Sequence, residues 1–320
     1  MARQIKFEAK GVIPACLTPF DEQLRVNERA YRGHLRDIAS VGGISAICAN
    51  GHAGEVSSLT FDEQRRIAAI TREALGEKVP VVIGVFTNSS MEAARLARMA
   101  QDEGADALLV FPPDILGLEG HMRPASIIEH FRYITEASDL PIIAFQYPLV
   151  SRLAYPLETL LELCQRYPQI RAIKDQYGDG KVHERHIREL AALQRPVNVL
   201  TTHSTWLLGS LAMGCQGILS GAGSVIANLQ VALFNAVQGG DLKKAQEIND
   251  RIFPTVRAFY DSPLFDQHNR MKEALVILRR LDRAHVRPPL IKISGEEIAK
   301  IAEFLEQAGL RPETAYAKVA

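Results

Sequence analysis

The chain lacks several features that mark whole classes of protein. It has 320 residues but only four cysteines, Cys16, Cys48, Cys164 and Cys215, and no two of them have the CxxC spacing of a zinc or redox site. Cys48 and Cys215 lie in apolar surroundings, which predicts buried, reduced packing residues. Lys plus Arg number 37 and Asp plus Glu number 37, so no net field attracts nucleic acid or an anionic membrane. We therefore expect no metal, no nucleic acid and no membrane partner.

Membrane-spanning runs, signal-peptide features and low-complexity segments are also lacking. The first ten residues are polar, and no apolar run reaches the length that crosses a bilayer. Hydrophobic residues make up 47% and charged residues 23%, an ordinary globular balance. These absences predict a cytoplasmic protein with one large α/β domain or two smaller ones.

What is present is a regular alternation of apolar runs with amphipathic helical stretches. The apolar runs are continuous, which is typical of parallel strands buried on both faces. Strands are predicted at Val12–Leu17, Ile44–Ala49, Val79–Val85, Ala107–Phe111, Pro141–Phe145, Ile170–Lys174, Val197–Thr201 and Gly217–Ser220. Eight β–α units in roughly 230 residues favour a closed (β/α)8 TIM barrel, with an open doubly wound sheet as the alternative.

Helices are predicted between these strands and, without further strands, after Val225. The intervening helices are Asn27–Ser40, one that Thr60 and Glu63 begin with a capping box, Ser90–Glu103, Ile127–Ala137, Leu157–Arg166, Val182–Leu193 and Trp206–Met213. The later ones are Ala227–Gln238, Leu242–Tyr260, Asn269–Leu281 and Gly295–Ala308. We therefore expect a barrel over residues 1–226 and a C-terminal helical region over 227–320 that packs on it.

Two motif-like segments do not meet the requirements of the sites they resemble. His183-Glu184-Arg185-His186 lacks the zinc-helix spacing, because position 187 is isoleucine, and a solvated helix face is the expected role. Gly221-Ala222-Gly223 follows a predicted strand, but the third glycine of a dinucleotide loop would fall at Ile226. Neither segment predicts a metal or a cofactor.

Lys174 ends one of the predicted strands and is the residue of greatest chemical interest. In a (β/α) barrel the active site lies at the carboxyl ends of the strands. Burial there disfavours the ammonium form and lowers the pKa of the amine. A neutral amine can attack a carbonyl and form a Schiff base. The alternative is a strand-end lysine whose head is in water.

Other strand ends are expected to converge on Lys174. Gly51 and Gly54 allow a tight turn whose backbone amides can approach a ligand and suit a carboxylate. A carboxylate beside a Schiff-base lysine indicates a 2-oxo acid substrate. The predicted substrate-binding residues are Gly51, Ala53, Gly54, Phe145, Tyr147, Thr202 and Leu219.

Several segments, in order along nearly the whole chain, resemble the dihydrodipicolinate synthase / N-acetylneuraminate lyase family of class I aldolases. Gly11–Pro14 with Thr18-Pro19-Phe20 is similar to its first strand, and Gly51–Glu55 falls on its Gly-Thr-Thr-Gly-Glu turn. Ile173-Lys174-Asp175 matches the segment that bears its Schiff-base lysine, and Gly217–Ser220 matches its eighth strand.

The resemblance implies a TIM barrel with a helical C-terminus and no cofactor. It implies that Lys174 condenses with the keto group of pyruvate or another 2-oxo acid. The enamine then adds to, or is released from, an aldehyde. Some members instead dehydrate sugar-derived 2-oxo acids. Members are commonly tetramers, so a homo-oligomer, tetramer or dimer, is expected.

The chain departs from the family pattern at the turn. His52 and Ala53 replace two threonines that hold the substrate carboxylate and relay protons. Ala53 keeps the backbone amide but has no hydroxyl. His52 can donate an N–H or act as acid or base near neutral pH, so we predict a catalytic role for it. The alternative is a packed or solvent-facing loop histidine. His203 is a second candidate histidine, or a neighbour of a helix cap at Ser204.

A second departure concerns the catalytic tyrosine, which the resemblance places at Phe145. Tyr147 lies two residues along, and a packed loop tyrosine is its expected role. Leu149 and Val150 stand where synthases carry an arginine, with Arg152 beyond them. The sequence therefore predicts a Schiff-base lyase or aldolase that is not a true dihydrodipicolinate synthase. A 2-oxo sugar acid dehydratase, or a non-catalytic binding protein on a retired aldolase scaffold, is the alternative.

Overall fold

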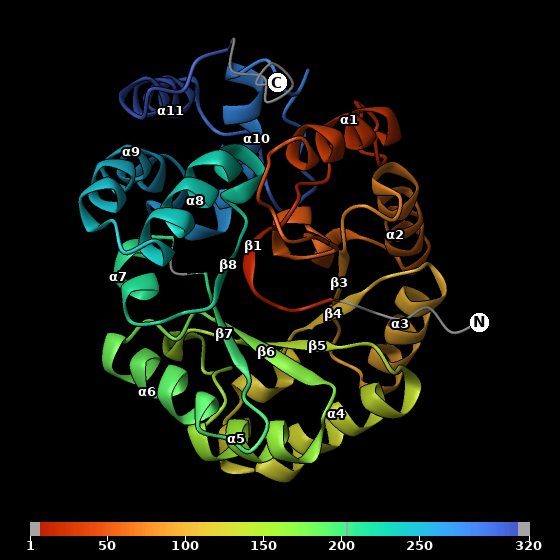
Figure 1. Ribbon diagram of the computed structural model, residues 1–320. Helices are drawn as coiled ribbons and strands as arrows, with labels where there is room; N and C mark the ends of the chain where they lie inside the picture. Colours follow the sequence, from red (N-terminus) through yellow and green to blue (C-terminus); the bar gives the residue numbers. More distant parts are fainter. Residues whose placement is uncertain (1–6, 203, 313–320) are drawn as a thin grey trace.

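The computed structural model describes residues 7–202 and 204–312, in which eight parallel strands form a ring inside a layer of helices (Figure 1). The strands are β1 (Gly11–Pro14), β2 (Ile47–Ala49), β3 (Val81–Val85), β4 (Ala107–Val110), β5 (Ile142–Gln146), β6 (Ile170–Asp175), β7 (Asn198–Thr201) and β8 (Gly217–Ser220). They pair in the order β1-β8-β7-β6-β5-β4-β3-β2. Parallel bridges from Val12 to Ile44 and from Ala15 to Cys48 close the ring. The predicted barrel is confirmed.

The helices that cover the barrel follow the strands in chain order. They are α1 (Glu28–Ala39), α2 (Phe61–Leu75), α3 (Ser90–Asp102), α4 (Pro124–Ala137), α5 (Leu157–Arg166), α6 (Gly180–Ala191), α7 (Leu207–Ala212) and α8 (Gly223–Gln238). Short 3₁₀ turns after β2, β4 and β5 are η1 (His52–Gly54), η2 (Val56–Ser58), η3 (Asp114–Gly117), η4 (Gly120–Met122) and η5 (Leu149–Ser151).

Polar side chains cap the starts of α1 and α2, and the cap of α2 is the predicted capping box. Asn27 accepts a hydrogen bond from the Ala30 amide at 3.1 Å and caps α1. The predicted capping box of α2 is present, because Thr60 and Glu63 each bind the other's backbone amide. Such caps satisfy amides that have no partner inside the helix.

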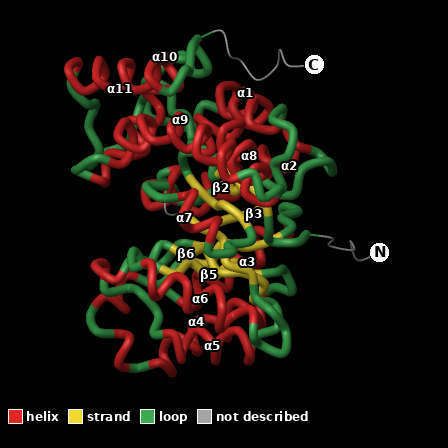
Figure 2. Tube along the Cα trace, turned by 60° about the vertical axis from the view of Figure 1, so that its left-hand side comes forward, coloured by secondary structure: helices red, strands yellow, loops and turns green. Residues whose placement is uncertain are grey.

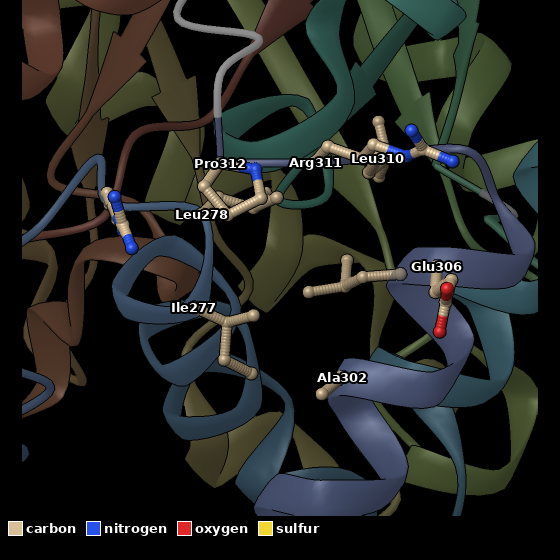
Figure 3. Close-up of a pocket in the computed structure, with 9 residues that line it drawn as sticks. Ile277, Leu278, Ala302, Glu306, Leu310, Arg311 and Pro312 are labelled. Carbon is tan, nitrogen blue, oxygen red and sulfur yellow. The ribbon is translucent and has the colours of Figure 1, made fainter.

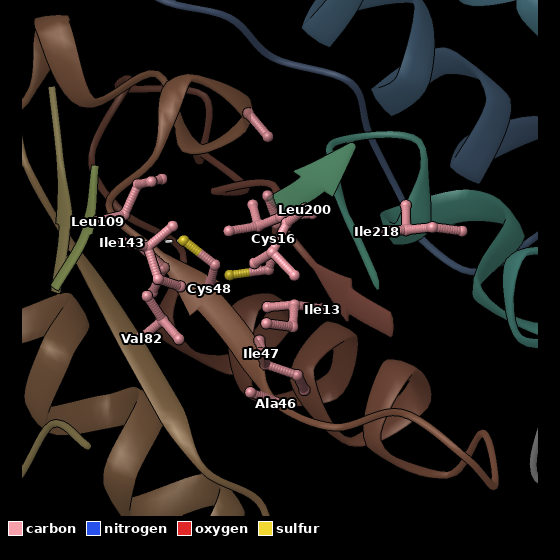
Figure 4. Close-up of a cluster of buried hydrophobic side chains, with 14 of the residues drawn as sticks. Ile13, Cys16, Ala46, Ile47, Cys48, Val82, Leu109, Ile143, Leu200 and Ile218 are labelled. Atoms are coloured by element: carbon pink, nitrogen blue, oxygen red, sulfur yellow. Dashed lines mark hydrogen bonds between the residues drawn. The ribbon is translucent and has the colours of Figure 1, made fainter. Parts of the chain in front are cut away.

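Buried side chains from strands all around the ring fill the inside of the barrel (Figure 4). Ile13, Val82 and Ile143 are fully buried there, and the cluster continues to Cys16 and Cys48. The four cysteines are all free and buried, as predicted for Cys48 and Cys215. The barrel is thus a packed core, and space for a ligand is confined to its end.

The helices after the barrel gather on one side of it, next to α8 (Figure 2). They are α9 (Leu242–Tyr260), α10 (Gln267–Ile277) and α11 (Gly295–Gln307), with η6 (Leu264–Asp266) between the first two. α8 runs through residue 226 and contacts β1, β8 and α9, so the division at 226 stays a proposal. No helix of the described ranges is long and apolar enough to cross a membrane.

A hollow of about 780 Å³ lies between α10 and α11 (Figure 3). Its lining is Ile277, Leu278, Arg279, Ala302, Leu305, Glu306, Leu310, Arg311 and Pro312. It contains no lysine, histidine, cysteine or serine, so it offers no nucleophile. The chemistry of the chain is concentrated at the carboxyl ends of the strands instead.

Candidate active site

Lys174 lies at the carboxyl end of β6, between Phe145 on β5 and Leu200 on β7. The side chain is only 7% exposed, and its Nζ lies 4.0 Å from the centroid of the Phe145 ring. Burial lowers the pKa of the amine to about 8, although Cys48 acts in the opposite direction. The head group is therefore not in water, and a useful fraction of the amine is neutral near neutral pH.

A small cavity of about 50 Å³ opens beside Lys174. Its lining is Ala15, Gly51, His52, Ala53, Leu109, Phe145, Lys174, Gln176, Thr202, Gly221, Tyr260, Gln267 and His268. Six residues predicted from the sequence meet here, whereas Gly54, Tyr147 and Leu219 are not in the lining. A cavity of this size holds a few water-sized groups, so it fits a short substrate.

The turn from Gly51 to Glu55 forms one wall of the cavity. Gly54 and Glu55 donate their amides back to the carbonyls of Gly51 and His52, at 3.0 and 2.9 Å. The first amides of such a turn have no acceptor within it, and they can bind an anion. A glycine on β3 makes room for this turn, because a Cβ on Gly84 would lie 1.9 Å from the Asn50 carbonyl oxygen.

His52 forms a hydrogen-bonded pair with the hydroxyl of Tyr147 through its Nε2. β5 ends at Gln146, and the Tyr147 side chain points to the Gly51–Glu55 turn. Its ring centroid lies 4.5 Å from that of Phe145. The expected packed loop position of Tyr147 is confirmed, and the hydrogen bond to His52 is an addition that the sequence did not predict. Burial lowers the pKa of His52 to about 3 and raises that of Tyr147. His52 is thus a neutral hydrogen-bonding group near pH 7, not one that titrates there.

The prediction of a solvated helix face is wrong for His183 and His186, although Glu184 and Arg185 between them do reach the surface. His183 and His186 are buried, and both Nδ1 atoms bind Asp175 Oδ2 at 2.8 Å. His183 Nε2 lies 2.6 Å from Ser210 Oγ. Burial raises the pKa of Asp175, but the two histidine hydrogen bonds outweigh it, so the net shift is downward. The ionised Asp175, which directly follows Lys174, thus ties α6 to the carboxyl end of β6.

The structure adds residues that sequence reasoning missed. Gln176 follows β6, whereas Tyr260, Gln267 and His268 come from the helices after the barrel. Gln267 and His268 are two polar residues at the start of α10. Polar residues are common at helix starts, so the sequence alone did not mark these two as part of a site.

Other candidate positions lie away from the cavity or outside the description. Arg152 is exposed with φ 59° and is not in the lining. His203 lies outside the described residues. Within residues 7–202 and 204–312, no group of three or more His, Cys, Asp or Glu side chains could hold a metal ion.

Comparison with known proteins identifies the family of the chain. The model of the dihydrodipicolinate synthetase family matches residues 8–308. The chain belongs to that family. The dihydrodipicolinate synthetase family consists of lyases of the class I aldolase type, and the predicted resemblance is confirmed.

Relatives within the dihydrodipicolinate synthetase family align over almost their full length. The 4-hydroxy-tetrahydrodipicolinate synthase of Methanopyrus kandleri is 32% identical over 314 residues, covering 96% of this chain and 99% of the relative. That of Bartonella bacilliformis is 31% identical, covering 95% and 99%. A family protein of E. coli K12, YagE, solved in complex with pyruvate, superposes with a TM-score of 0.86 at 24% identity, covering 94% and 99%.

Proposed function

We propose that the chain is a Schiff-base lyase or aldolase that acts on a short 2-oxo acid such as pyruvate, with Lys174 as the nucleophile. The observation that carries the proposal is the buried Lys174 amine, with its pKa lowered to about 8, in a cavity that the Gly51–Glu55 turn also lines. The small cavity favours a three-carbon acid over a long sugar acid, which places dehydratase chemistry second. The pyruvate complex of the E. coli family protein supports the same substrate class.

The proposed reaction begins when neutral Lys174 Nζ attacks the keto carbon of the acid. The resulting carbinolamine takes a proton on its hydroxyl group, loses water and becomes a protonated imine. Backbone amides of the turn hold the carboxylate beside it. Loss of a proton from the carbon next to the imine gives an enamine, which adds to an aldehyde. In the reverse direction the same enamine is the product of carbon–carbon cleavage.

We propose that the pair of His52 and Tyr147 relays the protons that a tyrosine at position 145 would otherwise carry. Phe145 has no hydroxyl, whereas Tyr147 supplies one next to its ring. With Nδ1 protonated, neutral His52 accepts a hydrogen bond from the Tyr147 hydroxyl at Nε2, and transfer of that proton to Nε2 together with release of the Nδ1 proton keeps the ring neutral during the relay. A retained donor and acceptor pair favours an active enzyme over a retired scaffold.

The same features argue against true dihydrodipicolinate synthesis. A carboxylated aldehyde needs a cation at its far end, but the cavity lining contains no arginine, and Arg152 is exposed. We therefore propose an aldehyde different from the one that the synthases use.

Borohydride reduction in the presence of pyruvate, followed by peptide mass analysis, tests the proposed nucleophile. We expect the reduced pyruvyl adduct at Lys174. Lys272 is a matched internal control, because it is also buried with a pKa lowered to about 8, but it is paired with Glu55. Mass on neither lysine with pyruvate or other short 2-oxo acids would refute the proposal, and mass on Lys272 alone would reassign the nucleophile.

We also propose that the chain self-associates through the loops after β4 and β5. Ile115, Leu118, Met122 and Val150 are 60%, 79%, 72% and 91% exposed there. The two loops adjoin, since a Cβ on Gly117 would lie 3.5 Å from Leu153 Cδ2. Light scattering should show a dimer or tetramer whose mass falls in the Leu118→Asp variant; a monomeric wild type would refute this expectation.

A further inference from the structure

The first turn of α10 reaches the cavity that contains Lys174. Gln267 and His268, the first two residues of this helix, both line the cavity, together with Tyr260 at the end of α9. The imine chemistry proposed above uses none of the three. Side chains that meet a reactive amine without a part in forming the imine are placed to contact another portion of the substrate.

A buried ion pair fixes α10 against the turn that binds the carboxylate. Lys272, one turn after His268, donates to Glu55 Oε1 and, at 2.8 Å, to the His285 carbonyl. The Arg287 amide donates to Glu55 Oε2 at 3.0 Å. Because Glu55 directly follows η1, the Gly51–Gly54 turn and the start of α10 keep a constant relative position.

The wall that α10 completes is polar but uncharged. Gln176, Thr202, Tyr260, Gln267 and His268 contribute amide, hydroxyl and imidazole groups. Among the lining residues there is no arginine, aspartate or glutamate, and Lys174 is the only amine. Burial lowers the pKa of His268 well below its usual value, and His52, Lys272 and Lys174 lower it further, so the ring is neutral. Such a wall hydrogen-bonds hydroxyl groups but does not neutralise a second carboxylate.

We propose that Gln267 and His268 form a subsite that hydrogen-bonds the hydroxyl group of a short, uncharged hydroxyaldehyde held beside the imine on Lys174. The inference rests on the proposed function, because this aldehyde reacts only with the enamine. The enamine carbon forms a bond to the aldehyde carbon, and the aldehyde oxygen takes a proton and becomes a hydroxyl. Water then hydrolyses the imine, which releases a 4-hydroxy-2-oxo acid and regenerates the amine.

The test compares aldehydes and variants with pyruvate as the common donor. Glycolaldehyde and glyceraldehyde are the uncharged probes, and succinic semialdehyde is the carboxylated one. We expect the wild type to favour a hydroxyaldehyde over succinic semialdehyde by about 10-fold or more in kcat/KM. Gln267→Ala and His268→Asn should raise KM for that aldehyde about 10-fold, with borohydride trapping of pyruvate changed less than about twofold.

Matched controls and a second readout separate the possible failures. Gln194→Ala and His121→Asn replace exposed residues of the same types, and should leave both measurements unchanged. Three outcomes would overturn the proposed subsite while trapping at Lys174 persists. The wild type would prefer succinic semialdehyde, or use neither hydroxyaldehyde, or both α10 variants would keep the wild-type KM. If the wild type shows no borohydride trapping of pyruvate at Lys174, the proposed function itself is overturned.

Discussion

The Lys174 amine faces the ring of Phe145 at 4.0 Å from its centroid, at the position where the family resemblance places a catalytic hydroxyl. An aromatic face attracts the ammonium form by about 0.5–2 kcal/mol, whereas burial disfavours it. Burial prevails, because the pKa of Lys174 is lowered to about 8. Phe145 thus moderates the charge of the Lys174 amine but cannot transfer a proton. This division of roles leads to the following expectations.

The rate of imine formation should follow the neutral fraction of Lys174. Because the pKa is lowered to about 8 from its usual 10.5, the initial rate of borohydride trapping should rise about tenfold per pH unit below 8. It should level off above about pH 9. A rate that continues to rise tenfold per unit up to pH 10 would show an amine with an ordinary pKa.

Lys174→Met should abolish trapping and yet stabilise the fold at neutral pH. The pKa of Lys174 is lower in the folded state than in the unfolded state. Between pH 8 and 10.5 the folded chain therefore binds fewer protons than the unfolded chain, and the free energy of unfolding of the wild type rises with pH. The advantage of the variant, on the order of 3 kcal/mol, is complete below pH 8 and lost above 10.5. Urea unfolding at pH 7 and 10.5 measures it; equal differences at both pH values would contradict the linkage.

Tyr147→Phe should separate imine formation from proton transfer. The variant keeps the ring beside Phe145 but removes the hydroxyl that binds His52 Nε2. We expect trapping of pyruvate to persist and kcat to fall about 100-fold, the usual contribution of a positioned acid or base. Tyr133→Phe, at a half-buried residue of α4 on the outside of the barrel, is the matched control. If both variants keep full turnover, Tyr147 has no part in the relay.

Asp175→Asn should destabilise the chain strongly, since Asp175 accepts from two buried histidines. The amide removes the charge and leaves donors facing donors, which costs about 3–5 kcal/mol. Glu184→Gln, on the exposed face of α6, breaks only the surface pair with Arg188 and should change stability by less than about 1 kcal/mol. Guanidinium unfolding compares the two; similar losses would contradict the importance of the buried network.

Lys272→Met should weaken the attachment of α10, because it leaves Glu55 buried without its cationic partner. We expect a loss of about 3–5 kcal/mol. The double variant Lys272→Met/Glu55→Gln removes the stranded charge and should regain part of this loss. A double-mutant cycle that shows no coupling would contradict the role given to the pair.

Local pattern was enough to predict the elements of the barrel. The bounds of α5, α9 and β8 agree with the prediction, because apolar periodicity and flanking caps act within a few residues. The face of α6 was misjudged. His183 and His186 share that face, but whether it meets water or Asp175 depends on packing against β6 and α7.

The sequence by itself determined the parallel barrel, because strands buried on both faces are continuous apolar runs. It also determined the lysine at the end of the sixth strand, because a single amine is conspicuous at the end of such a run. Only the tertiary structure decided what surrounds that amine. Tyr147 reaches His52 across 95 positions of sequence, and Glu55 binds Lys272 across 217. Contacts at such separations arise from the closure of the ring and the return of α10, which no local periodicity encodes.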